Sequence, residues 1–135
     1  MPTQVRTDDL LRELTEASSF LQRIVERLPE RDPVEMEVWS VYAVTEKVVA
    51  ILKFRIGVER PGLVTELPRA RISRELLPPA LVMMKESRTN IESNQLLEGL
   101  ETLRRARNNL RAYLSQERKA RIRQKRRTAT PRPSS

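Results

Sequence analysis

Apolar residues recur along this chain at alternating spacings of three and four positions, and this periodicity restricts the fold more than any other feature. A helix with such spacing carries one apolar stripe and one polar face. Before the first stripe, Thr7 can cap a helix whose first turn holds Asp8 and Asp9. The stripe itself consists of Leu10, Leu14, Ala17, Leu21, Ile24 and Leu28. The pattern predicts a helix over about residues 8–28, ended by Pro29.

A second stripe follows after a short link. Asp32 can cap its helix, and Pro33 suits the first helical position. Gly57 suits the left-handed residue that ends many helices. The β-branched residues here would also fit a strand, but strict alternation breaks at Ala43 and at Val48–Val49, so a helix is favoured. Its stripe consists of Val34, Val38, Val41, Thr45, Val48, Leu52 and Ile56.

The remaining chain predicts a long connection and two further helices. Residues 57–79 hold four prolines, which favours an extended segment with one helical turn after Ser73. Pro79 can open a third helix over about 79–91, with Leu81, Met84 and Ile91 on one side. After a break at residues 91–94, a last stripe is interrupted only at Arg107. Its members are Leu96, Leu100, Leu103, Leu110 and Leu114.

One stripe per helix predicts an all-α fold, a small antiparallel bundle of three to four helices over residues 7–116. The stripes would also serve a homodimer or a helical protein partner, and periodicity alone does not separate these outcomes. Residues 1–6 are expected to be flexible, and residues 117–135 to form a basic helical extension that is disordered from about 128. The aromatic residues lie within or beside the stripes, which predicts that they belong to the core. They are Phe20, Trp39, Tyr42, Phe54 and Tyr113.

The charge of the chain is unevenly distributed. The sequence has 26 Lys and Arg against 18 Asp and Glu, a formal net charge of +8. Eight of the basic residues and no acid lie in residues 118–135, so residues 1–117 are formally neutral. Seven of the eight fall within RKARIRQKRR, residues 118–127. Because a merely soluble helix mixes both signs, this asymmetry predicts a partner that carries negative charge.

The basic run favours nucleic acid, DNA or RNA, over other partners. Arginine binds phosphate oxygens through two parallel hydrogen bonds, and a helix places Arg104, Arg111, Arg118 and Lys125 along one stripe. The run has no aromatic residue on which a base can stack, so contacts to phosphates with little sequence discrimination are expected. Another acidic surface, of protein or lipid, and a solvated helix end are the alternatives. The predicted phosphate ligands are Arg104, Arg111, Arg118, Lys119, Arg121, Arg123, Lys125, Arg126 and Arg127.

A second basic cluster, RARISR at residues 69–74, follows the proline-rich link. It can begin a helix-turn-helix reading element with Arg69, Arg71 and Arg74 directed at DNA. Pro78 and Pro79 disfavour this arrangement, because they fall where a recognition helix would continue. A solvated loop that pairs with Glu66 or Glu75 is preferred.

Several classes of function are disfavoured by composition. The chain has no His and no Cys, and its three glycines form no phosphate-binding loop, so we expect no enzyme, metal, cofactor or small-molecule substrate. The longest apolar run, Val48 to Leu52, is too short to cross a membrane, and no secretory signal is visible at the N-terminus. Together with the absence of Cys, these features predict a cytoplasmic protein.

One stretch resembles a known family. LLRELTEASSFLQRI, followed by WSVYAVTEKVVAILKFRIG, resembles the helical hairpin of GINS, an assembly factor of the replicative helicase. The resemblance covers under half of the chain, and no β-rich second domain is visible. It implies an alternative function, that of a helical interaction or assembly subunit in which the basic tail is secondary.

Overall fold

The computed structural model describes residues 7–29, 33–57 and 67–129. These residues form four α-helices and one short 3-10 helix, and none of them lies in a strand. The elements are α1 (Thr7–Glu26), α2 (Glu35–Ile56), η1 (Ser73–Leu76), α3 (Leu77–Glu92) and α4 (Leu96–Ala129). The predicted all-α bundle is therefore confirmed. Residues 1–6, expected to be flexible, and residues 130–135 of the tail expected to be disordered from about 128, lie outside the described residues.

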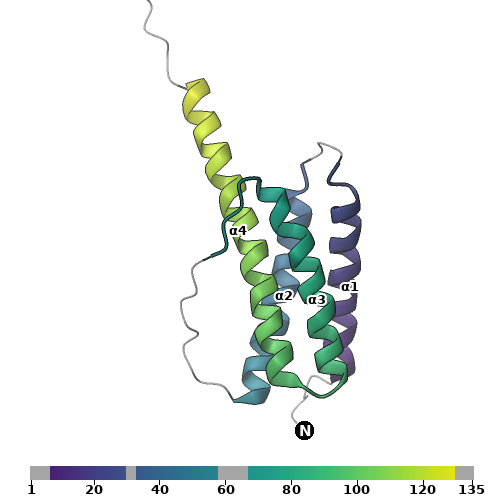
Figure 1. Ribbon diagram of the computed structural model, residues 1–135. Coiled ribbons are helices and arrows are strands. Elements are labelled where there is room, and N and C mark those ends of the chain that lie inside the picture. Colours follow the sequence, from purple (N-terminus) through teal and green to yellow (C-terminus); the bar gives the residue numbers. More distant parts are fainter. Residues whose placement is uncertain (1–6, 30–32, 58–66, 130–135) are drawn as a thin grey trace, which may run out of the picture.

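The four helices form a bundle in which each helix packs against two neighbours. Helix α1 packs on α2 and α3, and α4 packs on the same two helices, so the diagonal pairs do not meet. Figure 1 shows that α1 and α4 run in one direction and α2 and α3 in the other. Every packed pair is thus antiparallel. Because α2 and α3 are parallel, the end of α2 and the start of α3 lie at opposite ends of the bundle (Figure 1).

The apolar stripes build the core of this bundle. The helical side chains at their centres, such as Leu14, Val48 and Leu103, are fully buried. The stripe of α4 is interrupted by Arg107, whose side chain is only 17% exposed. Its Nε lies 3.1 Å from Oε1 of Glu46 on α2, in an ion pair that lacks the alignment of a hydrogen bond. The stripes therefore face the interior of one chain, where Arg107, at the position at which the pattern fails, is largely covered.

The helix ends agree with the sequence in most places. Gly57 has φ +72°, and its N–H donates to the carbonyl of Lys53. The break between α3 and α4 contains Asn94 at φ +60°. Helix α3 begins at Leu77, two residues before Pro79, and both Pro78 and Pro79 fall in its first turn, where a missing N–H is harmless. The helical turn predicted after Ser73 is η1.

The predicted start of the second helix is wrong. Pro33 lies outside α2, and the residue before the helix is Val34, which provides no side-chain cap. Val34 is 1% exposed, since its side chain packs into the core. Its backbone torsion angles are not helical. Asp32, the predicted cap, lies outside the described residues.

The expectation that the aromatic residues lie in the core is also wrong for two of them. Tyr113 is buried, but Trp39 is 49% exposed and Phe54 is 91% exposed. Both are on α2 and turned away from the core, Trp39 one position from the buried Val38 and Phe54 two positions from the buried Leu52. A neighbouring position on a helix points about 100° away, so a place beside a stripe does not ensure burial.

Candidate nucleic-acid interface

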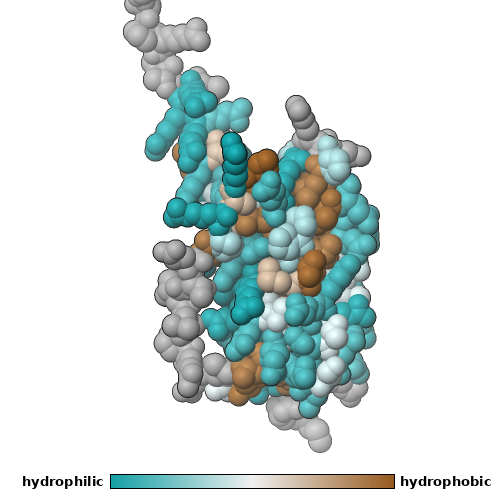
Figure 2. Space-filling model, in the orientation of Figure 1, coloured by the Kyte–Doolittle hydropathy of each residue, from teal (hydrophilic) through white to brown (hydrophobic). Residues whose placement is uncertain are grey.

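Helix α4 continues without interruption from the core into the basic run. Its last buried side chain is Leu114, and residues 118–127 are all exposed. Figure 1 shows that the C-terminal end of α4 projects beyond the other three helices. In Figure 2 this end is hydrophilic over nearly all of the surface in view, whereas hydrophobic residues gather in separate patches on the bundle. We call residues 118–127 the basic extension.

The basic extension is only partly matched by carboxylates of the same chain. Arg121 pairs with Glu35 at the start of α2, with 2.7 Å between Nη2 and Oε1. Lys125 and Arg126 interact with other groups of the chain. The other four cations form no ion pair with any residue that the structure describes. They are Arg118, Lys119, Arg123 and Arg127.

The two predicted phosphate ligands that precede the extension occupy different environments. Arg111 is exposed near the base of the extension, and Arg104 is half-buried, about 10 Å before Arg111 along α4. Neither has an ion pair among the described residues. The helix therefore places Arg111 with the basic extension, whereas Arg104 lies on the bundle itself.

A groove between α2 and α4 brings aromatic and basic side chains together. It has a volume of about 440 Å³. The rings of Trp39 and Tyr42 meet edge to face in its wall, with 5.6 Å between their centroids and 86° between their planes. We call this the Trp39 groove, and define it by Glu35, Trp39, Tyr42, Arg111, Arg118 and Arg121.

The Trp39 groove was not anticipated from the sequence. The basic extension has no aromatic side chain on which a base can stack, and the prediction from the sequence concerned that segment alone. The pairing of α2 with α4 places aromatic residues from one helix beside arginines from the other. The spacing of Trp39 and Tyr42, three positions apart on one helix face, was the available signal.

A second groove lies on another side of α4. It has a volume of about 530 Å³ and is lined by Arg69, Lys119 and Arg123, among others. The 67–70 segment is held there by Gln116, whose Nε2 donates to the carbonyl of Ala70 at 3.0 Å. One arginine of the RARISR cluster therefore lies beside two cations of the basic extension.

The other arginines of the RARISR cluster differ in their contacts. Arg74 donates from Nη1 to the carbonyl of Leu28 at 2.9 Å, which ties the segment to the end of α1. Arg71 is exposed. The pairing partner Glu66, considered from the sequence, lies outside the described residues. Helix α3, which follows the cluster, packs against α1 and α4 along its length.

Tyr113 lies at the junction between the core and the basic extension. It is 2% exposed, and this burial is the main reason why its pKa is raised to about 12. The negative charge of Glu117 raises the pKa further, and Arg74 opposes the shift. Glu117 also accepts a hydrogen bond from Ser73 of η1. The base of the extension is thus fixed by buried and paired groups.

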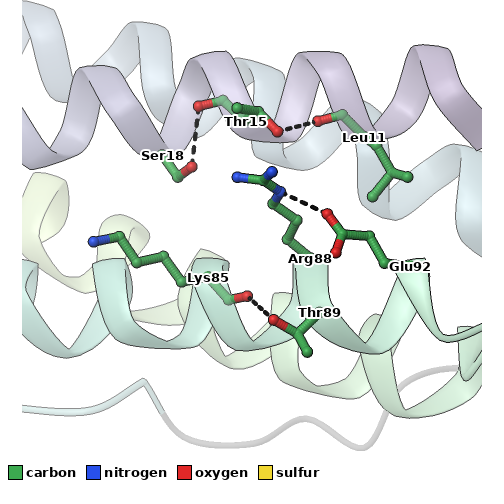
Figure 3. A network of polar contacts seen from close by, with 7 residues as sticks. All are labelled: Leu11, Thr15, Ser18, Lys85, Arg88, Thr89 and Glu92. Carbon is green, nitrogen blue, oxygen red and sulfur yellow. Dashed lines mark hydrogen bonds and ion pairs between the residues drawn. The ribbon is translucent and has the colours of Figure 1, made fainter.

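A polar network between α1 and α3 does not form a reactive site (Figure 3). Its hydroxyl groups donate to carbonyls of their own helices: Thr15 to Leu11 at 2.6 Å, and Thr89 to Lys85 at 3.2 Å. Arg88 pairs with Glu92 four residues later, at 2.9 Å. Because these hydroxyls serve as donors within single helices, the network has no activated nucleophile.

The fold defines the class of this molecule as a four-helix bundle whose last helix carries a basic extension. The chain matches no protein family, no curated protein and no solved structure. The resemblance to GINS therefore rests on residue pattern alone. Within the described ranges, no helix is long and apolar enough to cross a membrane, and no cluster of residues is suited to hold a metal ion.

Proposed function

We propose that this protein binds nucleic acid through the basic extension of α4, without catalysing a reaction. The observation that carries the proposal is the placement of seven basic side chains and no acid on ten exposed residues of a helix that leaves the bundle. Four of these cations have no ion pair among the described residues. A polyphosphate would supply the negative charge that the chain does not provide there.

The chemistry of the extension favours phosphate contacts over base reading. Guanidinium groups form paired hydrogen bonds with phosphate oxygens, and the binding releases counterions that surround the nucleic acid. Such contacts carry affinity but little sequence information. The function is therefore proposed as binding that depends strongly on salt and weakly on sequence.

The proposal is tested by removing the four cations that lack ion pairs. The first variant changes Arg118, Lys119, Arg123 and Arg127 to Gln. A matched control changes four exposed basic residues of the bundle, Arg12, Arg23, Lys85 and Arg105, to Gln, which lowers the net charge equally. The measurement is the salt dependence of binding to a labelled duplex, followed by fluorescence anisotropy.

The first variant is expected to reduce the slope of log K against log salt by up to about 3.6, because each duplex phosphate contact contributes about 0.9. The control is expected to change the slope by less than about 1. An equal reduction of the slope in both variants would show that binding depends on the net charge of the molecule and not on contacts at the extension. Unchanged binding in the first variant would remove the extension as the site.

The alternative, a helical assembly subunit, receives less support from the described residues. The stripes that would bind partner helices are buried in the core. Large apolar side chains with high exposure are spread over three helices. They include Met36 and Phe54 on α2, Val82 on α3 and Leu97 on α4. Ile122 is the one large exposed apolar side chain of the basic extension. Insertion of the extension into a lipid surface is therefore also disfavoured.

A further inference from the structure

The Trp39 groove combines basic and aromatic side chains, whereas the proposed phosphate contacts require only the basic ones. Arg111, Arg118 and Arg121 supply positive charge, but Trp39 and Tyr42 supply aromatic surface. Phosphate binding along a helix needs no aromatic residue. The presence of a half-exposed tryptophan among arginines therefore needs a separate explanation.

The geometry of Trp39 leaves an aromatic face available. Trp39 is 49% exposed, and its contact with Tyr42 is edge to face. In such a contact one ring presents its edge to the face of the other, so Tyr42 covers at most one face of the indole. With Trp39 49% exposed, part of the indole surface remains accessible to a ligand. A flat, apolar ring is the group that stacks best on this surface.

The charges around Trp39 favour a flat ring that carries phosphates. Arg111 and Arg118 line the same groove and form no ion pair with a described residue. The volume of about 440 Å³ is in the range of about 300–1,000 Å³ found for small-ligand sites. Stacking on aromatic side chains combined with a positively charged path is the usual way in which proteins bind single-stranded nucleic acid.

We propose that Trp39 stacks on an unpaired base of a single-stranded nucleic acid, while Arg111 and Arg118 bind the neighbouring phosphates. The strand then continues along the basic extension. This inference rests on the proposed function and specifies its substrate class. A duplex would contact the extension only, because the faces of its bases are covered by their neighbours in the stack.

Within this groove, the negative charge of Glu35 would repel the phosphates of the proposed strand. Its carboxylate pairs with Arg121 at 2.7 Å and places a negative charge beside the proposed phosphates. Glu35→Gln removes this charge and leaves Arg121 available to the ligand. The variant is expected to bind a single strand about fivefold more tightly, because this is the effect of removing the repulsion between two unit charges about 4 Å apart in water. Because misfolding would weaken binding, a gain of affinity in this variant reports on the removed charge.

Trp39 is the one tryptophan of the chain, so its emission reports directly on the groove. The probes are an oligodeoxythymidylate and an oligouridylate of about 16 nucleotides, and a DNA duplex of the same length. Both single strands are expected to quench the emission, and the duplex is expected to bind with little quenching. The relative affinities of the two single strands distinguish DNA from RNA as the ligand.

Substitution of Trp39 separates stacking from charge. Trp39→Ala is expected to weaken single-strand binding about 10-fold and to change duplex binding less than about twofold, measured by anisotropy with labelled probes. Trp39→Phe keeps a ring and is expected to retain most of the affinity. The control is Phe54→Ala, which removes an exposed aromatic residue about 22 Å away along α2 and is expected to change neither affinity.

The two levels of the proposal fail in different ways. If single strand and duplex both bind but Trp39→Ala weakens them equally, or if no single strand quenches the emission, the stacking inference is wrong and the proposed function stands. If none of the probes binds, both are wrong. Circular dichroism of each variant, compared with the parent protein, identifies any loss of affinity that comes from unfolding.

Discussion

Gly99 allows α3 and α4 to approach closely just after the turn that joins them. A Cβ atom at this position would lie 2.8 Å from Cγ1 of Ile91 and 3.3 Å from the carbonyl oxygen of Ser87. The Ser87 hydroxyl also donates to the Gly99 carbonyl at 2.6 Å, in a buried contact between the helices. The small residue is thus required by packing, although glycine weakens a helix.

Gly99→Ala is expected to lower the free energy of unfolding by about 1–3 kcal/mol. Helix propensity alone would favour alanine by about 1 kcal/mol, so the sign of the change reports the crowding against Ile91. Urea denaturation measures the difference. Glu101→Ala, at an exposed position of the same helix, is the control and is expected to change stability by less than about 0.5 kcal/mol. A stabilised Gly99→Ala protein would contradict the close approach.

Tyr113 predicts a loss of stability at alkaline pH. Its pKa is about 12 in the folded protein and about 10 in an unfolded chain. Below pH 10 both states keep the proton, so the buried phenol carries no penalty. Between pH 10 and 12 the unfolded state releases the proton first, and unfolding is favoured by up to about 2 kcal/mol. Tyr113→Phe should lose less stability over this interval in urea titrations at each pH, whereas parallel curves would show that other groups cause the decline.

Trp39 shows what residue patterns cannot predict. Its position beside the stripe of α2 is compatible with burial or exposure, because the outcome depends on which helix covers that side. The exposed cations of the basic extension were easier to predict, since the sequence has no apolar stripe after Leu114 that could bury this part of the helix. The arginines of the groove were identified from sequence, but their aromatic neighbours were not.

At the scale of elements, α4 joins two segments that are stabilised differently. Up to Leu114 its residues pack into the core, whereas residues 118–127 are exposed and carry like charges four positions apart. Such pairs destabilise a helix by about 0.2–0.5 kcal/mol each. The cations near the helix C-terminus interact favourably with its dipole, which offsets part of this repulsion.

We therefore expect amide hydrogens of residues 122–127 to exchange far faster than those of residues 100–114. Local opening of the extension exposes no buried apolar surface, whereas opening of the core segment does. Addition of oligodeoxythymidylate should slow exchange in the extension and leave α1 unchanged, which mass spectrometry of peptides can measure. Equal protection of both segments without ligand would show that the extension is stabilised within the protein.

The helices themselves were largely predictable because each carries its own periodic stripe and its own end signal. Gly57 and the prolines of α3 act through local backbone geometry, which needs no tertiary information. The start of α2 was not predictable in this way. There the residue before the helix is the buried Val34, and its burial depends on the other helices.

At the scale of the whole molecule, the arrangement of the four helices decides the character of the interface. Periodicity predicts that helices pack but does not specify which pairs meet. In this bundle α2 lies beside α4 and α1 does not, so the groove next to the basic extension receives Trp39 and Tyr42. Had α1 taken that place, the groove beside the basic extension would contain neither Trp39 nor Tyr42.

The unbroken path of α4 has a mechanical consequence. Its 34 residues span about 51 Å with no internal break, so the basic extension continues the axis of the core segment of the same helix. In the proposed complex, the tilt of α4 among its neighbours would set the direction in which the bound strand leaves the molecule. A repacked interior would redirect that strand even if every side chain that touches it were kept.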